Sequence, residues 1–186
     1  ISSIIEGCCI DPVKSEKMPL FDMEYIFLNI RAKSVGEIVK LKVKCPDDEE
    51  TEVEIELDLT KINVEMSDDH DARIQLTDNI GVLMSYPNFS TVSKAQKVVE
   101  GKETEQLFEM IADCMFQVWE GEETYDAMDY TAKDKREFLE SLDHQQFEKL
   151  QIFFETMPTL KHEVEVTNPK TNVTSKVTLS GINAFF

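Results

Sequence analysis

The sequence predicts an α+β fold in which helices pack against small antiparallel β-hairpins, and three observations support this class. Two stretches, 39–64 and 160–186, alternate apolar and polar residues with the period of a β-strand. Two others, 18–33 and 103–119, have the apolar patterns of helices, because apolar residues nearly encircle the first and recur at three- and four-residue steps in the second. With 186 residues, 41% of them hydrophobic, the chain can bury one sizeable core, or one core with a small satellite. We therefore expect a single α+β domain over residues 1–186.

The predicted domain has four segments in chain order. They are an N-terminal helical segment at 1–37, a β-hairpin region at 38–88, a helical region at 89–159 and a C-terminal β-hairpin at 160–186. Residue 1 is Ile, and Ile4 and Ile5 resemble the end of an apolar segment already under way. We therefore expect a native N-terminal portion to precede residue 1.

The first helix is predicted from Met18 to Lys33, with Pro19 in its first turn. The helix should be buried on most sides and form the centre of the fold, because apolar residues nearly encircle it. These residues are Leu20, Phe21, Met23, Tyr25, Ile26, Phe27, Leu28 and Ile30. Ser34-Val35-Gly36 ends it.

A β-hairpin is predicted from Val39 to Val64, with its chain reversal at 46–50. Apolar residues alternate with lysines in the first arm and with acidic residues in the second. Antiparallel pairing of the two arms places Lys40, Lys42 and Lys44 opposite glutamates, and opposite charges in such pairs are favourable.

A second copy of this pattern closes the chain about 123 residues later. Cys45-Pro46 and Asn168-Pro169 then occupy equivalent places at the two hairpin tips, where zinc ribbons carry pairs of cysteines. A ribbon needs four ligands, and this chain offers one Cys in one tip and none in the other. We expect two pseudo-repeated, zinc-ribbon-like hairpins that lack metal ligands. An isolated hairpin is marginal in water, so both should dock on one layer of helices.

The stretch between the hairpins begins with an acidic loop, 66–71, and two short strands around Ile74–Leu76 and Ile80–Tyr86. A short helix is possible around Ala95–Val99. The clearest helix runs from Glu103 to Trp119, where apolar residues recur at steps of three and four and Gly121 supplies a stop.

Two further helices are indicated by their caps. Thr131 with Asp134 resembles a capping box that opens a helix through Leu142. Asp143 caps the next helix, which ends at Met157-Pro158.

No catalytic, cofactor-binding or metal-binding residue is assigned, and we do not expect an enzyme. The run 67–71 lacks the spaced carboxylates and glycine of a calcium loop, so it is interpreted as a solvated charge run. His144 and His162 have no Cys or Ser nucleophile at a recognisable spacing. Cys114 lies in the apolar stripe of its helix and should be a buried small hydrophobe.

The chain carries 37 Asp and Glu against 19 Lys and Arg, a formal charge of −18. This balance argues against nucleic acid and anionic membrane surfaces as partners. The excess of acidic residues either keeps the protein soluble or forms a face complementary to a basic protein. The four cysteines show no disulfide framework, which is typical of a reduced, cytosolic protein. Candidate partner-binding residues are Trp119, Phe185 and Phe186. Trp119 lies at the end of its helical stripe, where either half burial or a partner contact is expected. Phe185 and Phe186 cannot both face one side of a strand, which leaves one of them available to a partner.

Several segments resemble the baseplate hub protein family of T4-like contractile-tail phages. The longest is 20–28, LFDMEYIFL, continuing as IRAKSVGE at 30–37. TDNIGV with Tyr86-Pro87, FLESL with QFEK at 146–149, and FFETMP at 153–158 extend the resemblance over nearly the whole chain.

The resemblance implies a structural or assembly protein of the phage tail baseplate hub, and the family has no active site to transfer. Its partners would be other tail baseplate or hub proteins, with a homo-oligomer within the baseplate as a further possibility. It would occur in the virion and, during assembly, in the cytoplasm of the infected bacterial host. The alternative is a transient acidic assembly chaperone or adaptor that is absent from the mature virion.

Overall fold

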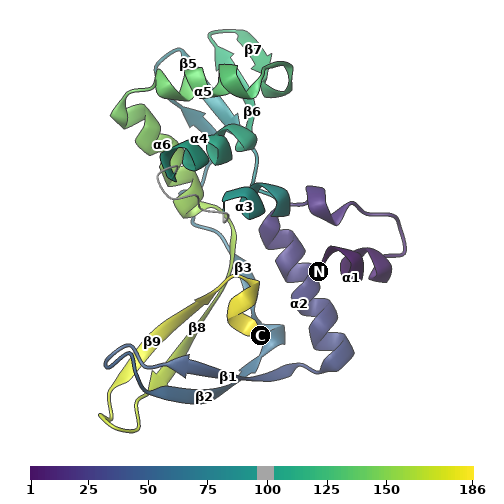
Figure 1. Ribbon diagram of the computed structural model, residues 1–186, viewed down its shortest axis with the longest axis vertical. Helices are drawn as coiled ribbons and strands as arrows, with labels where there is room; N and C mark the ends of the chain where they lie inside the picture. Colours follow the sequence, from purple (N-terminus) through teal and green to yellow (C-terminus); the bar gives the residue numbers. More distant parts are fainter. Residues whose placement is uncertain (96–102) are drawn as a thin grey trace. The chain divides into compact units, whose positions relative to one another are not determined.

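The computed structural model describes residues 1–95 and 103–186, which form helices and small antiparallel sheets (Figure 1). The α+β class is therefore confirmed. The chain folds into two compact units. The hairpin unit comprises Ile1–Ser15, Phe21–Glu65 and Pro158–Phe186, and the four-strand unit comprises Glu16–Leu20 and Met66–Met157. The single domain expected from the sequence stays a prediction. An unfolding experiment can test it, because the two units of a single cooperative domain would unfold together.

The hairpin unit contains a two-stranded and a three-stranded sheet. The order in the larger sheet is β3-β8-β9, and β1 pairs with β2 in the smaller one. Its helices are α1 (Ser2–Cys8) and α2 (Leu20–Val35), and its strands are β1 (Ile38–Lys44), β2 (Glu52–Asp58), β3 (Asn63–Glu65), β8 (Thr159–Thr167) and β9 (Thr174–Ser180). Because β3 precedes and β8 follows the long segment Met66–Met157, this sheet joins segments that lie far apart in the sequence.

The first hairpin has the predicted register. Lys40 lies opposite Glu56, Lys42 opposite Glu54 and Lys44 opposite Glu52. The Lys40 ammonium is 3.4 Å from the Glu54 carboxylate and 3.3 Å from that of Glu56. All of these side chains are exposed, so the ladder of charges contributes more to register than to stability.

The pseudo-repeat is confirmed at the two hairpin tips. The Glu49 N–H donates to the Cys45 carbonyl and the Asn172 N–H to the Asn168 carbonyl, each at a four-residue spacing. Glu49 and Asn172 also share a left-handed backbone, with φ of 55° and 59°. Since non-glycine residues rarely adopt this conformation, its recurrence at equivalent positions identifies the same turn in both hairpins.

One hydrophobic core joins both hairpins to α2. Its buried residues are Leu28, Ala32, Val39, Val43, Leu57, Leu59, Ile62, Leu160, Val166, Leu179, Ile182 and Phe185. The predicted burial of α2 on most sides agrees with the structure. Of the eight apolar residues that nearly encircle the helix, Met23 and Leu28 are buried, five are partly buried and Tyr25 is exposed. The helix itself is confirmed, with its start at Leu20 directly after Pro19.

The four-strand unit has one antiparallel sheet with the order β4-β5-β6-β7. Its strands are β4 (Arg73–Gln75), β5 (Ile80–Met84), β6 (Met115–Glu120) and β7 (Glu123–Asp126), and its helices are α3 (Phe89–Ala95), α4 (Glu103–Cys114), α5 (Ala132–Glu140) and α6 (His144–Thr156). Val82, Ile111, Leu150 and Phe153 lie at the centre of a core shared by sheet and helices. The helices of 89–159 therefore cover a second sheet, whereas the sequence suggested that they would cover the hairpins.

The predicted helix from Glu103 to Trp119 is wrong in its last five residues. The helix ends at Cys114, and Met115 begins strand β6, which pairs with β5 and β7. Met115, Phe116, Val118 and Trp119 fit a helical stripe by spacing, yet aromatic and β-branched residues also favour strands. Pairing with the two neighbouring strands decides the outcome. The short helix expected at 95–99 lies outside the described residues after Ala95.

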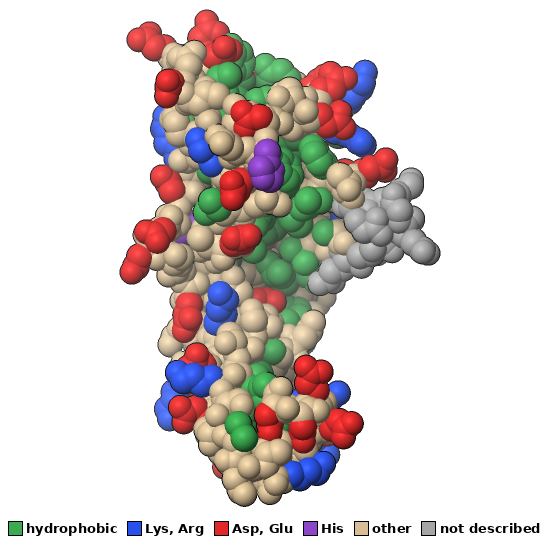
Figure 2. Space-filling model, turned by 90° about the vertical axis from the view of Figure 1, so that its left-hand side faces the viewer, with side chains coloured by type: hydrophobic (Ala, Val, Ile, Leu, Met, Phe, Trp, Pro, Cys, Tyr) green, Lys and Arg blue, Asp and Glu red, His purple; other side chains and the backbone are tan. Residues whose placement is uncertain are grey.

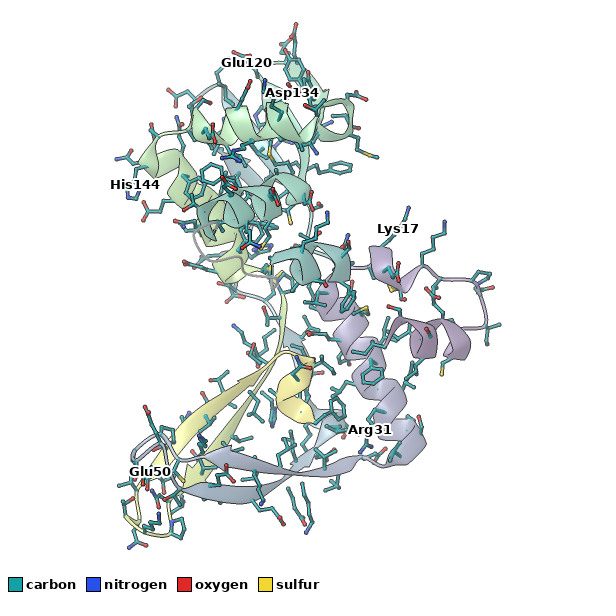
Figure 3. All side chains as sticks on the ribbon, viewed as in Figure 1. Lys17, Arg31, Glu50, Glu120, Asp134 and His144 are labelled. Carbon is teal, nitrogen blue, oxygen red and sulfur yellow. The ribbon has the colours of Figure 1, made fainter. Side chains whose placement is uncertain are left out.

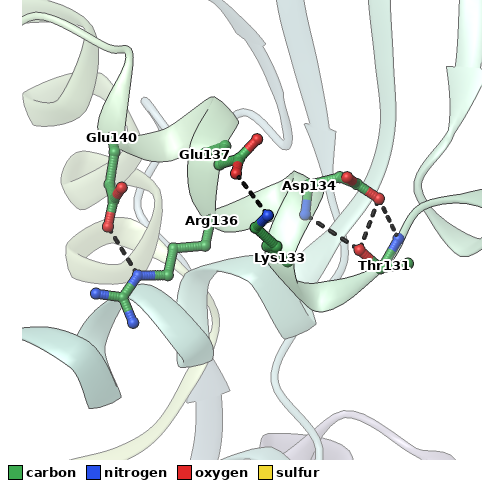
Figure 4. A network of polar contacts seen from close by, with 6 residues as sticks. All are labelled: Thr131, Lys133, Asp134, Arg136, Glu137 and Glu140. Atoms are coloured by element: carbon green, nitrogen blue, oxygen red, sulfur yellow. Dashed lines mark hydrogen bonds and ion pairs between the residues drawn. The ribbon is translucent and has the colours of Figure 1, made fainter.

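The predicted capping box at Thr131 and the predicted cap at Asp143 are both present. Asp134 accepts hydrogen bonds from the Thr131 N–H and hydroxyl, and its own N–H donates to the Thr131 oxygen (Figure 4). Asp143 and Gln146 form the second box at the start of α6. These boxes fix where α5 and α6 begin, which places the residues of α5 beside β6 and β7.

Candidate functional site

The two C-terminal phenylalanines have opposite environments. A short 3-10 helix, Ile182–Phe185, carries Phe185 into the core, where it has no exposed surface. Phe186 is 51% exposed and lies edge-on to Phe27, with the ring centroids 5.9 Å apart. The Arg31 guanidinium stands 5.8 Å from the Phe186 ring (Figure 3 labels Arg31). Phe186 therefore offers a positioned aromatic surface beside α2, and Phe185 anchors it.

A buried carboxylate holds the terminal turn in place. The Ile182 N–H donates to Glu24 Oε1 at 3.1 Å, and Glu24 is only 7% exposed. Burial raises the pKa of Glu24, and the hydrogen bond from Ile182 opposes this rise. Glu24 was not predicted from the sequence, although an acidic residue inside the apolar run 20–28 was a usable signal.

Trp119 is buried within the four-strand unit. Its indole lies directly over Gly81, where an added Cβ would come 2.0 Å from the ring. The Arg73 guanidinium stacks on the indole at 4.4 Å, so the side chain is only 7% exposed. A partner would reach the ring only after Arg73 moved. The partner-binding role of Trp119 stays a prediction, while its packing role is evident.

The two hairpin tips are joined by polar side chains. Asn168, which has no exposed surface, donates from Nδ2 to both carboxylate oxygens of Asp47 at 3.0 Å, and the Thr171 hydroxyl donates to Asp47 as well. These hydrogen bonds lower the pKa of Asp47. Cys45 is buried at the position equivalent to Asn168. Within residues 1–95 and 103–186, no three Cys, His, Asp or Glu side chains converge as a metal site requires.

His70 belongs to an ordered network, although the sequence predicts only a solvated charge run there. Its Nδ1 lies 2.9 Å from the Thr156 hydroxyl and its Nε2 3.0 Å from the Tyr86 hydroxyl. Because the Thr156 hydroxyl donates to the Ile152 carbonyl, it accepts from Nδ1–H, and in the neutral imidazole Nε2 accepts from the Tyr86 hydroxyl. Burial lowers the pKa of His70, which favours this neutral form. The neighbouring Asp68, Asp69 and Asp71 are exposed, as expected for a charge run.

The remaining histidines lie in different units of the molecule. His144 is exposed at the first position of α6 (Figure 3), and His162 lies on β8 at a shallow pocket beside β2. Cys114 is buried as predicted, and burial raises the pKa of its thiol to about 12. None of the helices in the described parts of the chain is long and apolar enough to cross a membrane.

A pocket of about 450 Å³ lies between strands β6–β7 and helix α5. Its walls are mainly apolar, and its charged lining residues are Glu120, Asp134 and Lys135. It is lined by Ile80, Met115, Val118, Glu120, Tyr125, Ala127, Tyr130, Asp134, Lys135, Phe138 and Ser141. Figure 3 labels Glu120 and Asp134, which come from the strand and the helix that border the pocket. Nothing in the sequence predicts this pocket, because α5 and β6–β7 form it together.

Acidic side chains are spread over both units on the face that Figure 2 shows, with hydrophobic side chains reaching the surface between them. Exposed large hydrophobic residues in the hairpin unit include Ile38, Val173 and Phe186, and those in the four-strand unit include Phe116, Met128 and Tyr130. Such residues scattered singly are ordinary on a protein surface, so a candidate interface needs a pocket or a fixed anchor in addition.

Comparison with known families gives one full-length match. The family model described as T4 bacteriophage base plate protein covers residues 1–186. No curated protein and no solved structure matches the chain.

Proposed function

The chain belongs to the family of T4 bacteriophage base plate proteins, and on this basis we propose that it acts in the hub of the phage tail baseplate. Membership places it among baseplate proteins of the virion tail and makes a structural role the plausible one. The proposed role is more specific than family membership: the protein builds or assembles the hub by binding other hub or baseplate proteins. Before incorporation it would be present in the cytoplasm of the infected host.

The observation that carries this proposal is the extent of the family match, which spans both structural units. A match confined to one unit would support only a shared module. The surface is compatible with protein contacts, because positioned apolar groups lie among acidic side chains. A basic neighbour would be attracted to such a surface and oriented by it.

Mass spectrometry of purified phage particles tests the proposal. Peptides of this chain, quantified against a known tail protein, should occur in a fixed ratio if it is a structural hub subunit. If they are absent from particles but present in infected-cell lysate in a complex with hub precursors, the protein is an assembly factor that leaves. Absence of any association with tail proteins would refute the proposal.

Of the three residues predicted to bind partners, we propose Phe186 as the contacting one, since Phe185 and Trp119 are buried. Phe186→Ser should weaken association with hub proteins and leave the core intact. Val173→Ser is the matched control, because Val173 is 45% exposed in the same unit but lies in a hairpin loop. Equal association of both variants and the unmodified protein would remove Phe186 from the interface.

A further inference from the structure

We infer that the pocket between β6–β7 and α5 docks an extended segment of a baseplate protein, in which an apolar side chain is flanked two residues away by Lys or Arg. The inference rests on the proposed function, because it takes the partner to be another baseplate protein. It adds where the partner binds and which side chains it presents. Three features of the molecule support it: the pocket, the free edge of the sheet beside it and the charge around it.

The pocket suits a large apolar side chain. Its volume of about 450 Å³ falls within the range of about 300–1,000 Å³ usual for ligand sites. Val118 and Tyr125 supply the sheet side of the wall, and Phe138 supplies the helix side. Tyr130, which is 46% exposed, stands edge-on to Tyr125 with ring centroids 6.5 Å apart. An inserted aromatic ring would therefore contact aromatic and aliphatic groups while burying surface that is now exposed.

Strand β7 offers a free edge next to the pocket. It is the last strand in the order β4-β5-β6-β7, and none of the described strands pairs with its outer side. An extended segment can add to such an edge through main-chain hydrogen bonds, while pockets select alternate side chains. The segment would thereby become a fifth strand of the sheet.

The register predicts which partner side chains share a face. Across the sheet, Val82, Val118 and Tyr125 form one row. Ile80, Glu120 and Glu123 form the next row, two residues further along each strand. Side chains of directly paired residues lie on the same face. A partner residue opposite Tyr125 would therefore point toward the pocket, and the residue two positions away would lie beside Glu123.

Charge selects the flanking residues of the partner. Residues 120–130 contain five carboxylates and no Lys or Arg. All five are exposed, and in the described parts of the chain none of them forms an ion pair with Lys or Arg. They are Glu120, Glu122, Glu123, Asp126 and Asp129. A basic residue on the partner would meet uncompensated negative charge, whereas an acidic residue would be repelled.

The same charge argues against a second copy of this chain as the occupant. Each copy carries a formal charge of −18, so self-association at this rim would bring like charges together. The two exposed residues after the strand, Met128 at 84% and Tyr130, would be covered by a basic partner instead.

Synthetic peptides test the predicted chemistry with the full chain. The probe is a labelled Thr-Lys-Thr-Phe-Thr-Lys-Thr peptide, which places Lys two residues on either side of Phe. Its matched controls replace both Lys by Glu, or Phe by Ser. We expect each control to bind at least ~10-fold more weakly in fluorescence anisotropy, as hot-spot residues require. Binding of the glutamate peptide as tight as that of the lysine peptide would overturn the inference.

Paired substitutions in the full chain locate the site. Ser141→Trp fills the mouth of the pocket from the exposed end of α5, and Gln151→Trp places the same bulk on the exposed surface of α6. Glu120→Lys with Glu122→Lys reduces the formal charge of residues 120–130 from −5 to −1, and Glu148→Lys with Glu155→Lys makes the same charge change on α6. Only the first variant of each pair should reduce peptide binding and hub association, by about tenfold. Unchanged circular dichroism establishes that each variant is folded.

The outcomes separate this inference from the proposed function. If Ser141→Trp associates with baseplate proteins as the unmodified chain does, the pocket inference fails and the hub function stands. If the unmodified chain associates with no tail protein, the proposed hub function itself is refuted. A dimer in sedimentation that Ser141→Trp abolishes would show a second copy in the pocket and overturn the inference.

Discussion

The hairpin unit and the four-strand unit assemble their cores from chain segments of very different separation. The four-strand unit is nearly continuous over Met66–Met157, whereas the hairpin unit joins Phe21–Glu65 to Pro158–Phe186. Closing so long a connection costs chain entropy before the hairpin core can form. The hairpin unit therefore depends on contacts that bring its two halves together, namely the shared core and the polar contact between the hairpin tips.

The largest effect should follow from removing the second half of the hairpin unit. Deleting residues 160–186 takes Leu160, Val166, Leu179 and Phe185 out of the core. We expect β1 and β2 to lose protection from hydrogen exchange, while the sheet β4–β7 keeps it. An unchanged melting temperature with protected amides in 38–58 would show that the first hairpin needs no partner.

Single cavities in each core test whether the units unfold separately. Leu160→Ala and Ile111→Ala remove fully buried side chains from the hairpin and four-strand cores, and each should cost about 2–5 kcal/mol. Cys45 and Cys114 are buried thiols in the respective units, so their labelling rates report local opening. With Cys8 and Cys9 replaced by Ser, each cavity should mainly accelerate labelling of the thiol in its own unit. Equal acceleration of both thiols would instead establish 1–186 as one cooperative domain.

The contact between the hairpin tips should have an intermediate effect. Asn168→Ala removes both hydrogen bonds to Asp47 and empties a fully buried position, so we expect a loss of about 1–3 kcal/mol in denaturant unfolding. The control is Asn172→Gly, which keeps these hydrogen bonds and relieves a left-handed backbone. A loss no larger than that of the control would show that the tips are held by apolar packing alone.

The smallest effects are opposite pH dependences in the two units. The folded-state pKa of His70 is lowered below 6.5, so its neutral form stabilises the four-strand unit above pH 6.5. That stability is lost as the pH falls from 6.5 through the folded pKa. The folded-state pKa of Glu24 is raised above 4.5, so the hairpin unit loses stability as the pH rises from 4.5 through the folded pKa.

Two substitutions should remove these trends separately. Glu24→Gln retains an acceptor for the Ile182 N–H without a buried charge, so it should stabilise the protein at pH 7 and have less effect at pH 4. His70→Gln should flatten the pH dependence below 6.5 and leave that of Glu24 unchanged. Melting curves monitored by labelling of Cys45 and Cys114 measure both. If Glu24→Gln is less stable than the unmodified protein at pH 7, the hydrogen bond from the Ile182 N–H to the ionised carboxylate contributes more free energy than burial of the charge costs.

Local sequence patterns were sufficient for most of the helices and strands. The alternation in 39–64 predicted the register of the first hairpin, and Thr131 and Asp143 located the starts of α5 and α6. The recurrence after about 123 residues predicted equivalent tips, which the matching turns at Glu49 and Asn172 confirm. These features depend on hydrogen bonds and side-chain periods within a few residues, so the amino-acid order alone determines them.

Other features depend on contacts between distant segments. Met115–Trp119 fits a helix by spacing and becomes a strand because β5 and β7 supply pairing partners. The burial of Glu24, Trp119 and Asn168 depends on residues far away in the sequence, namely Ile182, Gly81 with Arg73, and Asp47. The pocket beside α5 likewise exists only once two strands and a helix meet. Local patterns carry no information about such contacts, because the residues that cover these side chains come from segments far away in the sequence.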